Sequence, residues 1–287
     1  ASLNIMETIN DITEMQQRCL ALREAGKRIA FVPTMGFLHE GHLSLLQEGR
    51  KQGDVLVLSI FVNPTQFGAG EDLDTYPRDF ERDERLAREA GTDLIFYPTA
   101  DTVYPENYCS YLSVEGPLTE TLEGACRPGH FRGVATVVAK LFNIVQPHVA
   151  LFGRKDFQQL AVIRQMVRDF NMPVDIKGMP IIREADGLAM SSRNVYLSDD
   201  ERRQSLALNQ SLSLAAELAR GGETKAQKIL EAALKRIAAE PSASIEYVKI
   251  CNADTLEEVE TIDQRSVMLL AVKVGTTRLI DNSYLLT

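Results

Sequence analysis

The run of residues 55–62 constrains the fold of this 287-residue chain more than any other stretch. Its sequence, Val-Leu-Val-Leu-Ser-Ile-Phe-Val, is apolar at nearly every position, which is typical of a strand buried on both faces of a parallel sheet. Asn63-Pro64 follows, and proline cannot continue the hydrogen-bond ladder of a central strand. The run therefore predicts an α/β domain with a central parallel strand.

Further apolar runs alternate with helical patterns before residue 181. We expect strands at 29–32, 94–97, 149–152 and 174–179, and helices over 12–25, from 43, over 79–90, 134–145 and 160–170. This alternation predicts a Rossmann-like wound parallel sheet. The stretch 98–133 is rich in proline and glycine, and we expect a long irregular loop there with a functional role.

The pattern changes after residue 182. A capping box, Ser198 to Glu201, opens a helix that extends to about residue 220, and a second helix extends to residue 240. Strand-like runs follow at 245–251, 266–274 and 278–286. Two helices followed by consecutive strands predict a smaller α+β domain with an antiparallel sheet. We therefore expect a first domain over 1–181 and a C-terminal lid domain over 182–287.

Composition narrows the class of protein. A formal net charge of −9 and a pI near 5.1 argue against a general nucleic-acid or anionic-membrane surface, so we expect neither partner. We find no apolar run of membrane-spanning length and no export signal. The four cysteines lack metal-site or redox spacing, which indicates a reducing compartment. We expect a cytoplasmic protein.

The stretch 33–42, Pro-Thr-Met-Gly-Phe-Leu-His-Glu-Gly-His, joins the strand at 29–32 to a helix. Unpaired amides and the helix dipole at such a helix start favour an anion. Gly36 and Gly41 would let a bulky ligand approach the backbone. We interpret the stretch as a nucleotide-phosphate site that His39 and His42 contact. An ordinary strand-to-helix turn with a capping histidine is the alternative.

Polar residues also follow the other predicted strands. Asn63, Pro64 and Gln66 follow the strand at 55–62, residues 153–156 with Gln158 and Gln159 follow the strand at 149–152, and Arg183 with 190–194 follow the strand at 174–179. Because the carboxyl ends of parallel strands meet at one sheet edge, these segments would supply cations, amides and hydroxyls together. A serine–histidine–acid set, a metal-ligand cluster and a glycine-rich lysine loop are all missing from the pattern. The expected chemistry is nucleotidyl transfer by positioning and electrostatic stabilisation.

The His-Glu-Gly-His stretch at 39–42 resembles the HxGH motif of the nucleotidyltransferase superfamily related to class I aminoacyl-tRNA synthetases. Within that superfamily the chain closely resembles the pantothenate synthetase (pantoate–β-alanine ligase) family. The matching segments occur in order along almost the whole chain: 32–36, 38–42, 59–64, 66–67, 76–78, 122–124, 127–131, 155–159, 186–194 and 279–282.

This resemblance implies a two-step reaction with ATP and magnesium. The pantoate carboxylate attacks the α-phosphate to give pantoyl-adenylate and pyrophosphate, and the amine of β-alanine then displaces AMP to give pantothenate. The resemblance also implies a homodimer.

The resemblance assigns roles to individual residues. ATP binding falls to Met35, Gly36, Phe37, Leu38, His39, Glu40, Gly41, His42, Gly153, Arg154, Lys155, Asp156, Ile182, Met190, Ser191, Ser192 and Arg193. The catalytic set is His39, His42, Lys155, Ser191, Ser192 and Arg193, with His42 the usual proton donor. Gln66 and Gln159 bind pantoate, Gln66 also neighbours β-alanine, and Asp83 matches a magnesium-associated position. Arg154 and Arg82 depart from the family, which usually has acids there.

Two other functions compete with the ligase. Another nucleotidyltransferase of the superfamily would act on a phosphorylated acceptor, but the glutamine pair and the C-terminal domain count against it. A catalytically silent nucleotide-binding module would not need His39, His42, Lys155 and Arg193, all of which are present.

Overall fold

The computed structural model describes residues 6–286 and divides them into two compact units, which are treated separately below. The first unit comprises the residues up to Val114 together with Arg127–Arg154 and Val162–Pro180. The second comprises Glu115–Cys126, Lys155–Ala161 and the residues from Ile181 onward. The domain ranges 1–181 and 182–287 stay a prediction.

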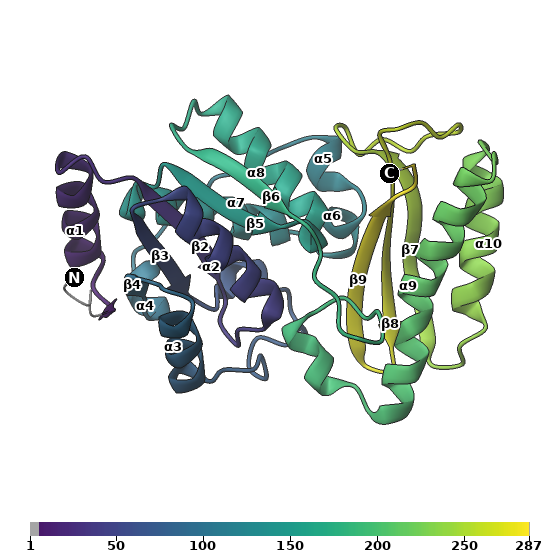
Figure 1. The fold of residues 1–287 in the computed structure, drawn as a ribbon, viewed down its shortest axis with the longest axis horizontal. Coiled ribbons are helices and arrows are strands. Elements are labelled where there is room, and N and C mark those ends of the chain that lie inside the picture. The colour runs from purple at the N-terminus through teal and green to yellow at the C-terminus, as the bar shows by residue number, and fades with distance from the viewer. Residues whose placement is uncertain (1–5, 287) are drawn as a thin grey trace. The chain divides into compact units, whose positions relative to one another are not determined.

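A six-stranded parallel sheet forms the centre of the first unit (Figure 1). Its order is β1-β4-β3-β2-β5-β6, which confirms the predicted wound α/β fold. The sequence did not predict β1, which is three residues long. The strands are β1 (Glu7–Ile9), β2 (Ile29–Thr34), β3 (Val55–Ile60), β4 (Leu94–Phe96), β5 (Val149–Gly153) and β6 (Asp175–Met179).

Both faces of the sheet are covered by helices, as the apolar runs predicted. Val32 and Leu58 share a core cluster with Leu46 of α2, whereas Phe31 of β2 packs edge-on against Phe142 of α7. The helices with residues in this unit are α1 (Ile12–Glu24), α2 (Glu40–Gln52), α3 (Phe80–Glu89), α4 (Ala100–Val103), α7 (His130–Val145) and α8 (Phe157–Asp169). The 3-10 turns are η1 (Pro64–Gln66) and η2 (Arg154–Asp156).

The prediction that residues 98–133 form an irregular loop was partly wrong. The segment contains α4, α5 (Pro117–Glu120) and α6 (Glu123–Cys126), and α7 begins at His130 instead of residue 134. Each added helix is a single turn, too short to show a helical period in the sequence.

The second unit contains an antiparallel sheet of order β7-β8-β9 with two helices packed along it (Figure 1). Leu212 of α9 and Ile229 of α10 share one core cluster with Val272 of β8. This confirms the predicted α+β arrangement. The elements are η3 (Ser192–Tyr196), α9 (Asp199–Arg220), α10 (Ala226–Ala238), β7 (Ala243–Asn252), β8 (Ser266–Val274) and β9 (Thr277–Tyr284). Between residues 6 and 286, no helix has the length and apolar character needed to cross a membrane.

Candidate active site

The loop from Met35 to His42 follows the carboxyl end of β2 and leads into α2. Gly36 and Phe37 both have positive φ, +83° and +51°, so the chain turns sharply here. The buried carboxylate of Asp83, at the start of α3, accepts hydrogen bonds from the backbone N–H groups of Phe37 and Leu38, both at 2.7 Å. Burial raises the pKa of Asp83 above its ordinary value, and the two amide hydrogen bonds oppose that shift.

His39 and His42 cap the start of α2 and lie side by side. The Nδ1 atom of His39 accepts the backbone N–H of Gly41 at 3.1 Å, and Nδ1 of His42 accepts the backbone N–H of His39 at 3.2 Å. The ring centroids are 4.0 Å apart. Because both Nδ1 atoms act as acceptors, each neutral ring carries its proton on Nε2. The loop therefore holds both imidazoles as Nε2–H donors.

Gln66 of η1 is brought next to this loop, with its Nε2 atom 3.5 Å from the Met35 sulfur. The side-chain oxygen of Gln66 accepts a hydrogen bond from Nδ2 of Asn63 at 3.0 Å. The Asn63 oxygen in turn accepts from the Tyr104 hydroxyl at 2.8 Å. Burial raises the pKa of Tyr104 to about 12, so its hydroxyl keeps its proton and donates. This chain of contacts turns the N–H groups of Gln66 toward Met35.

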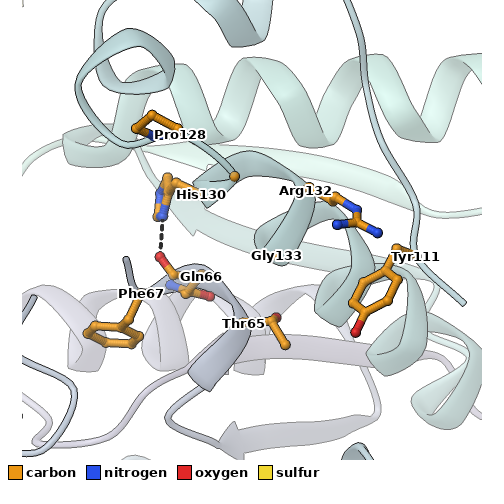
Figure 2. A pocket seen from close by; sticks show the side chains of 9 residues that line it. Thr65, Gln66, Phe67, Tyr111, Pro128, His130, Arg132 and Gly133 are labelled. Atoms are coloured by element: carbon orange, nitrogen blue, oxygen red, sulfur yellow. Dashed lines mark hydrogen bonds between the residues drawn. The ribbon is translucent and has the colours of Figure 1, made fainter. Parts of the chain in front are cut away.

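A small cavity of about 150 Å³ lies beside Gln66, between η1 and the start of α7 (Figure 2). His130 lines it, and its Nδ1 lies 2.8 Å from the Gln66 carbonyl oxygen while its Nε2 lies 3.3 Å from the Arg127 guanidinium. A carbonyl only accepts and a guanidinium only donates, so His130 is held with its proton on Nδ1. Arg127 also forms a bidentate ion pair with Glu71. Although burial opposes it, the Arg127 hydrogen bonds and charge lower the pKa of Glu71.

Gly133 of α7 allows η1 to pack against the helix. A Cβ atom on Gly133 would lie 2.3 Å from the carbonyl oxygen of Thr65 and 2.7 Å from Cα of Gln66. Both are backbone atoms, so the turn that carries Gln66 could approach α7 this closely only at a glycine. The predicted pantoate residue is thus placed by backbone packing as well as by Asn63.

The second unit contains Lys155, Asp156 and Gln159. The Lys155 carbonyl accepts a hydrogen bond from Asn282 of β9 at 3.0 Å, and the Lys155 ammonium lies 3.8 Å from the Asp156 carboxylate. Gln158 is buried, and its amide group bonds the backbone of Leu118, Thr121 and Glu123. Gln159 is half-buried. Of the two adjacent glutamines, Gln158 therefore has a structural role, because its side chain is buried and bonded to the backbone.

The segment from Ile182 to Arg193 forms a tight loop in the second unit. The Met190 N–H donates to the Ile182 carbonyl at 3.0 Å, which brings these two predicted ATP residues together. Ser191 caps η3 by accepting the Arg193 N–H at 3.2 Å, and Ser192 is buried. Arg183 anchors the loop through a bidentate ion pair with Asp281, at 2.7 and 2.9 Å.

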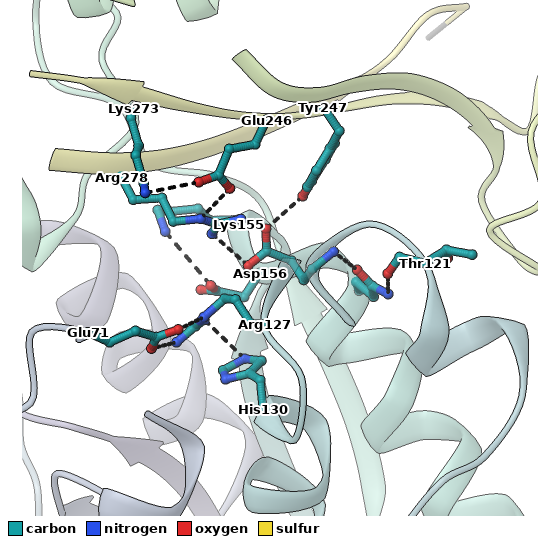
Figure 3. A network of polar contacts seen from close by, with 12 residues as sticks. Glu71, Thr121, Arg127, His130, Lys155, Asp156, Glu246, Tyr247, Lys273 and Arg278 are labelled. Atoms are coloured by element: carbon teal, nitrogen blue, oxygen red, sulfur yellow. Dashed lines mark hydrogen bonds and ion pairs between the residues drawn. The ribbon is translucent and has the colours of Figure 1, made fainter. Parts of the chain in front are cut away.

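A partly buried ion-pair network lies elsewhere in the second unit (Figure 3). Arg278 of β9 contacts both carboxylate oxygens of Glu123 at 2.7–2.8 Å, and Tyr247 donates to Glu123 at 2.8 Å. Arg278 also pairs with Glu246 at 2.7 Å. These contacts attach α6 to the antiparallel sheet, which is why the segment Glu115–Cys126 belongs to this unit. Sequence reasoning missed the network because its members are far apart in the chain.

The remaining residues predicted to bind ATP all belong to the first unit. Glu40 and Gly41 form the first turn of α2, Gly153 ends β5, and Arg154 is exposed in the first unit. Sequence reasoning counted Asn63 only among the polar residues at the sheet edge, and it gave no role to Tyr104 or His130. Asn63 and His130 stood within recognised segments, whereas nothing in the pattern pointed to Tyr104.

Comparison with known proteins identifies close relatives over the full length. The family model described as "Pantoate-beta-alanine ligase" matches residues 7–284. A pantothenate synthetase of Syntrophotalea carbinolica is 62% identical over 98% of this chain and 99% of its own length. The crystal structure of pantothenate synthetase from Thermus thermophilus matches with a TM-score of 0.94 at 45% identity, covering 98% of this chain and all of the other. The pantoate-beta-alanine ligase of Francisella tularensis, complexed with beta-gamma ATP and beta-alanine, matches with a TM-score of 0.79 at 31% identity and covers 98% of each chain.

Proposed function

This chain belongs to the pantoate–β-alanine ligase family, and we propose that it joins pantoate to β-alanine through a pantoyl-adenylate. In the first step a pantoate carboxylate oxygen attacks the α-phosphorus of ATP, and the bond to pyrophosphate breaks. In the second, the unprotonated amine of β-alanine attacks the acyl carbon, and the bond to AMP breaks. The Francisella tularensis complex supports ATP and β-alanine as ligands of the family.

The observation that carries this proposal is the pair of histidines held as Nε2–H donors. Negative charge develops on the phosphate oxygens as the α-phosphorus is attacked, and fixed donors stabilise it without reorganisation. His39 and His42 supply two such donors at the start of α2, where the helix dipole adds to their effect. Protonation of Nδ1 would break the capping hydrogen bonds. We therefore propose that neutral imidazoles hydrogen-bond the phosphates, instead of His42 acting as a cationic acid.

The other predicted residues receive complementary roles. Gln66 presents N–H groups, which suit the carboxylate or hydroxyl oxygens of pantoate better than the ammonium group of β-alanine. Gln159 is the second pantoate residue. Lys155 and Arg193 supply cations for the phosphates, and Ser191 and Ser192 supply hydroxyl groups. Met35–Leu38, Gly153, Arg154, Asp156, Ile182 and Met190 complete the ATP site.

We propose that magnesium enters together with ATP and is not bound by side chains of this chain. Asp83, the residue expected to bind it, is 1% exposed, and both of its oxygens accept backbone hydrogen bonds. Within residues 6–286 no group of three His, Cys, Asp or Glu side chains is arranged to hold a metal. These residues do not fit a protein-bound metal ion, so no step is assigned to one.

Assembly and location are further proposals from the family. We propose a homodimer, which sedimentation equilibrium would test, and a cytoplasmic enzyme without nucleic-acid or membrane partners. A monomer across the micromolar range would contradict the dimer.

Pantoate-dependent exchange of pyrophosphate into ATP tests the first step, and β-alanine-dependent AMP release tests the second. We expect exchange with pantoate alone and AMP only when β-alanine is added. Exchange that requires another acid or a phosphorylated acceptor, and not pantoate, would contradict the substrate assignment.

Replacing His42 separates its capping role from its catalytic role. His42→Asn keeps an acceptor near the Nδ1 position, so we expect a near-native melting temperature but a fall in exchange rate of about 100-fold, the loss typical of one donor to a developing oxyanion. The matched control is His148→Asn, because His148 Nδ1 also accepts a backbone amide, that of Ile29 at 3.0 Å. Its exchange rate should be unchanged. A normal rate in His42→Asn would mean that the histidine serves only as a helix cap.

A further inference from the structure

Asp83 accepts hydrogen bonds from the backbone of the Met35–His42 loop. Its Oδ2 accepts the Phe37 amide and its Oδ1 accepts the Leu38 amide, both at 2.7 Å. Two successive amides can point at one carboxylate because the chain passes through positive φ at Gly36 and Phe37. These short bonds to a charged acceptor belong to the stronger class of hydrogen bond.

Arg82, the residue before Asp83, also contacts Phe37 and Leu38. The Arg82 guanidinium donates to the Leu38 carbonyl at 2.8 Å and lies 5.3 Å from the centre of the Phe37 ring. Leu38 is therefore held through both its N–H and its C=O groups. Arg82 and Asp83 therefore both hold Phe37 and Leu38.

The conformation that these contacts fix is one the loop would not hold alone. Phe37 has a left-handed backbone without being glycine, a strained conformation that persists only when neighbouring groups impose it. His39, two residues later, caps α2 and accepts the Gly41 amide. The direction of both imidazoles therefore depends on how Phe37 and Leu38 are held.

We propose that Asp83 is a positioning residue, which holds Phe37 and Leu38 so that His39 and His42 face the ATP phosphates, and that it is not a magnesium ligand. This inference rests on the proposed function for the role of the histidines. The hydrogen bonds and burial of Asp83 do not depend on that function, so the two can fail separately.

The test compares Asp83→Asn with Asp93→Asn. Asp93 also accepts a backbone amide, that of Leu56 at 2.8 Å, but it precedes β4 at the opposite, amino-terminal edge of the sheet. In Asp83→Asn the new amide group cannot accept both N–H groups, so we expect hydrogen exchange at Phe37 and Leu38 to accelerate about tenfold or more without ATP. Asp93→Asn should leave these two amides unchanged, even if its global stability falls.

A magnesium titration of pyrophosphate exchange separates positioning from metal binding. We expect Asp83→Asn to lower the maximal rate at least about tenfold while the magnesium concentration for half-maximal rate stays the same. A higher half-maximal magnesium concentration with Phe37 and Leu38 still protected would overturn the proposal in favour of a metal ligand. Unchanged amide exchange and an unchanged rate would overturn it as well.

A second variant covers the case in which Asp83→Asn does not fold. Arg82→Met removes the hydrogen bond to the Leu38 carbonyl and keeps the apolar stem near Phe37. We expect a smaller acceleration of exchange at the same two amides, with the magnesium dependence unchanged. If wild type shows no pantoate-dependent exchange, the proposed function fails, and the amide measurements still decide the role of Asp83.

Discussion

The two segments proposed to bind ATP are held in different ways. In the first unit, the Met35–His42 loop is fixed through its own backbone, by the Asp83 carboxylate and by the ring nitrogens of His39 and His42. In the second unit, the Ile182–Arg193 segment has backbone hydrogen bonds within itself, such as that from Met190 to Ile182, and charged side chains attach it to β9 and α9. Arg183 pairs with Asp281, and Arg202 pairs with Glu184 and Asp186.

This difference indicates what each segment will tolerate. A loop held through its amides depends on exact backbone dihedrals, so the addition of one methyl group should disturb it. A loop held by ion pairs depends on charge, and its partly exposed pairs are weakened by salt. Backbone substitutions should therefore damage the first segment most, whereas charge removal and salt should act on the second.

The largest expected effect is that of Gly36→Ala. A Cβ atom there would lie 2.9 Å from Ile60 Cγ2 and 3.1 Å from Asp83 Oδ2, at a φ of +83°. We expect the free energy of unfolding to fall by about 2–3 kcal/mol and the pyrophosphate exchange rate to fall about 100-fold or more. Chemical denaturation and the exchange assay measure the two.

Gly70→Ala is the matched control, because Gly70 also has a φ of +83° but no neighbouring atom within 4 Å of the added Cβ. It should lose only about 1 kcal/mol, the cost of the dihedral itself, and keep its exchange rate. Equal losses in the two variants would show that dihedral strain, and not the contacts of the added Cβ with Ile60 and Asp83, explains the effect at Gly36.

The sequence was sufficient to predict the wound sheet, its strands other than β1, and the turn that joins β2 to α2. A strand buried on both faces needs apolar residues throughout, and a glycine-bearing turn into a helix has few alternatives, so both leave a local pattern. The same holds for the capping box of α9, where Ser198 and Glu201 exchange hydrogen bonds as expected. These features depend on residues close together in the chain.

Features that depend on distant residues could not be predicted. Asp83 and Leu38 are 45 residues apart, and no local pattern shows that a carboxylate on α3 accepts the loop amides. The sequence cannot distinguish the adjacent Gln158 and Gln159. Only the fold shows that the Gln158 side chain forms hydrogen bonds with the backbone of Thr121 and Glu123. Tertiary contacts of this kind decide which polar residues are available to a ligand.

We expect the next largest effect from Asp281→Asn, which removes a buried charge that anchors the Ile182–Arg193 segment. Asp281 is 3% exposed, and Asp281→Asn would leave the Arg183 guanidinium without its charged partner. Because Arg183 is partly exposed, we expect a loss of about 2 kcal/mol in the free energy of unfolding, together with a higher KM for ATP. Asp254→Asn, which removes the partner of an exposed arginine, should change neither quantity. Indistinguishable results for the two variants would mean that the buried pair does not anchor the segment.

The smallest expected effect is that of Arg202→Gln, and it tests the contrast between the two segments most directly. Arg202 pairs with Glu184 and Asp186 through side chains that are about one-third exposed. We expect a loss of about 0.5 kcal/mol in low salt that disappears near 1 M salt, because screening weakens exposed pairs. The loss caused by Asp83→Asn should persist in the same salt series, since those hydrogen bonds to backbone amides are buried. Denaturation of both variants across the series measures this, and parallel salt dependence would remove the distinction between a loop held by its backbone and a loop held by charge.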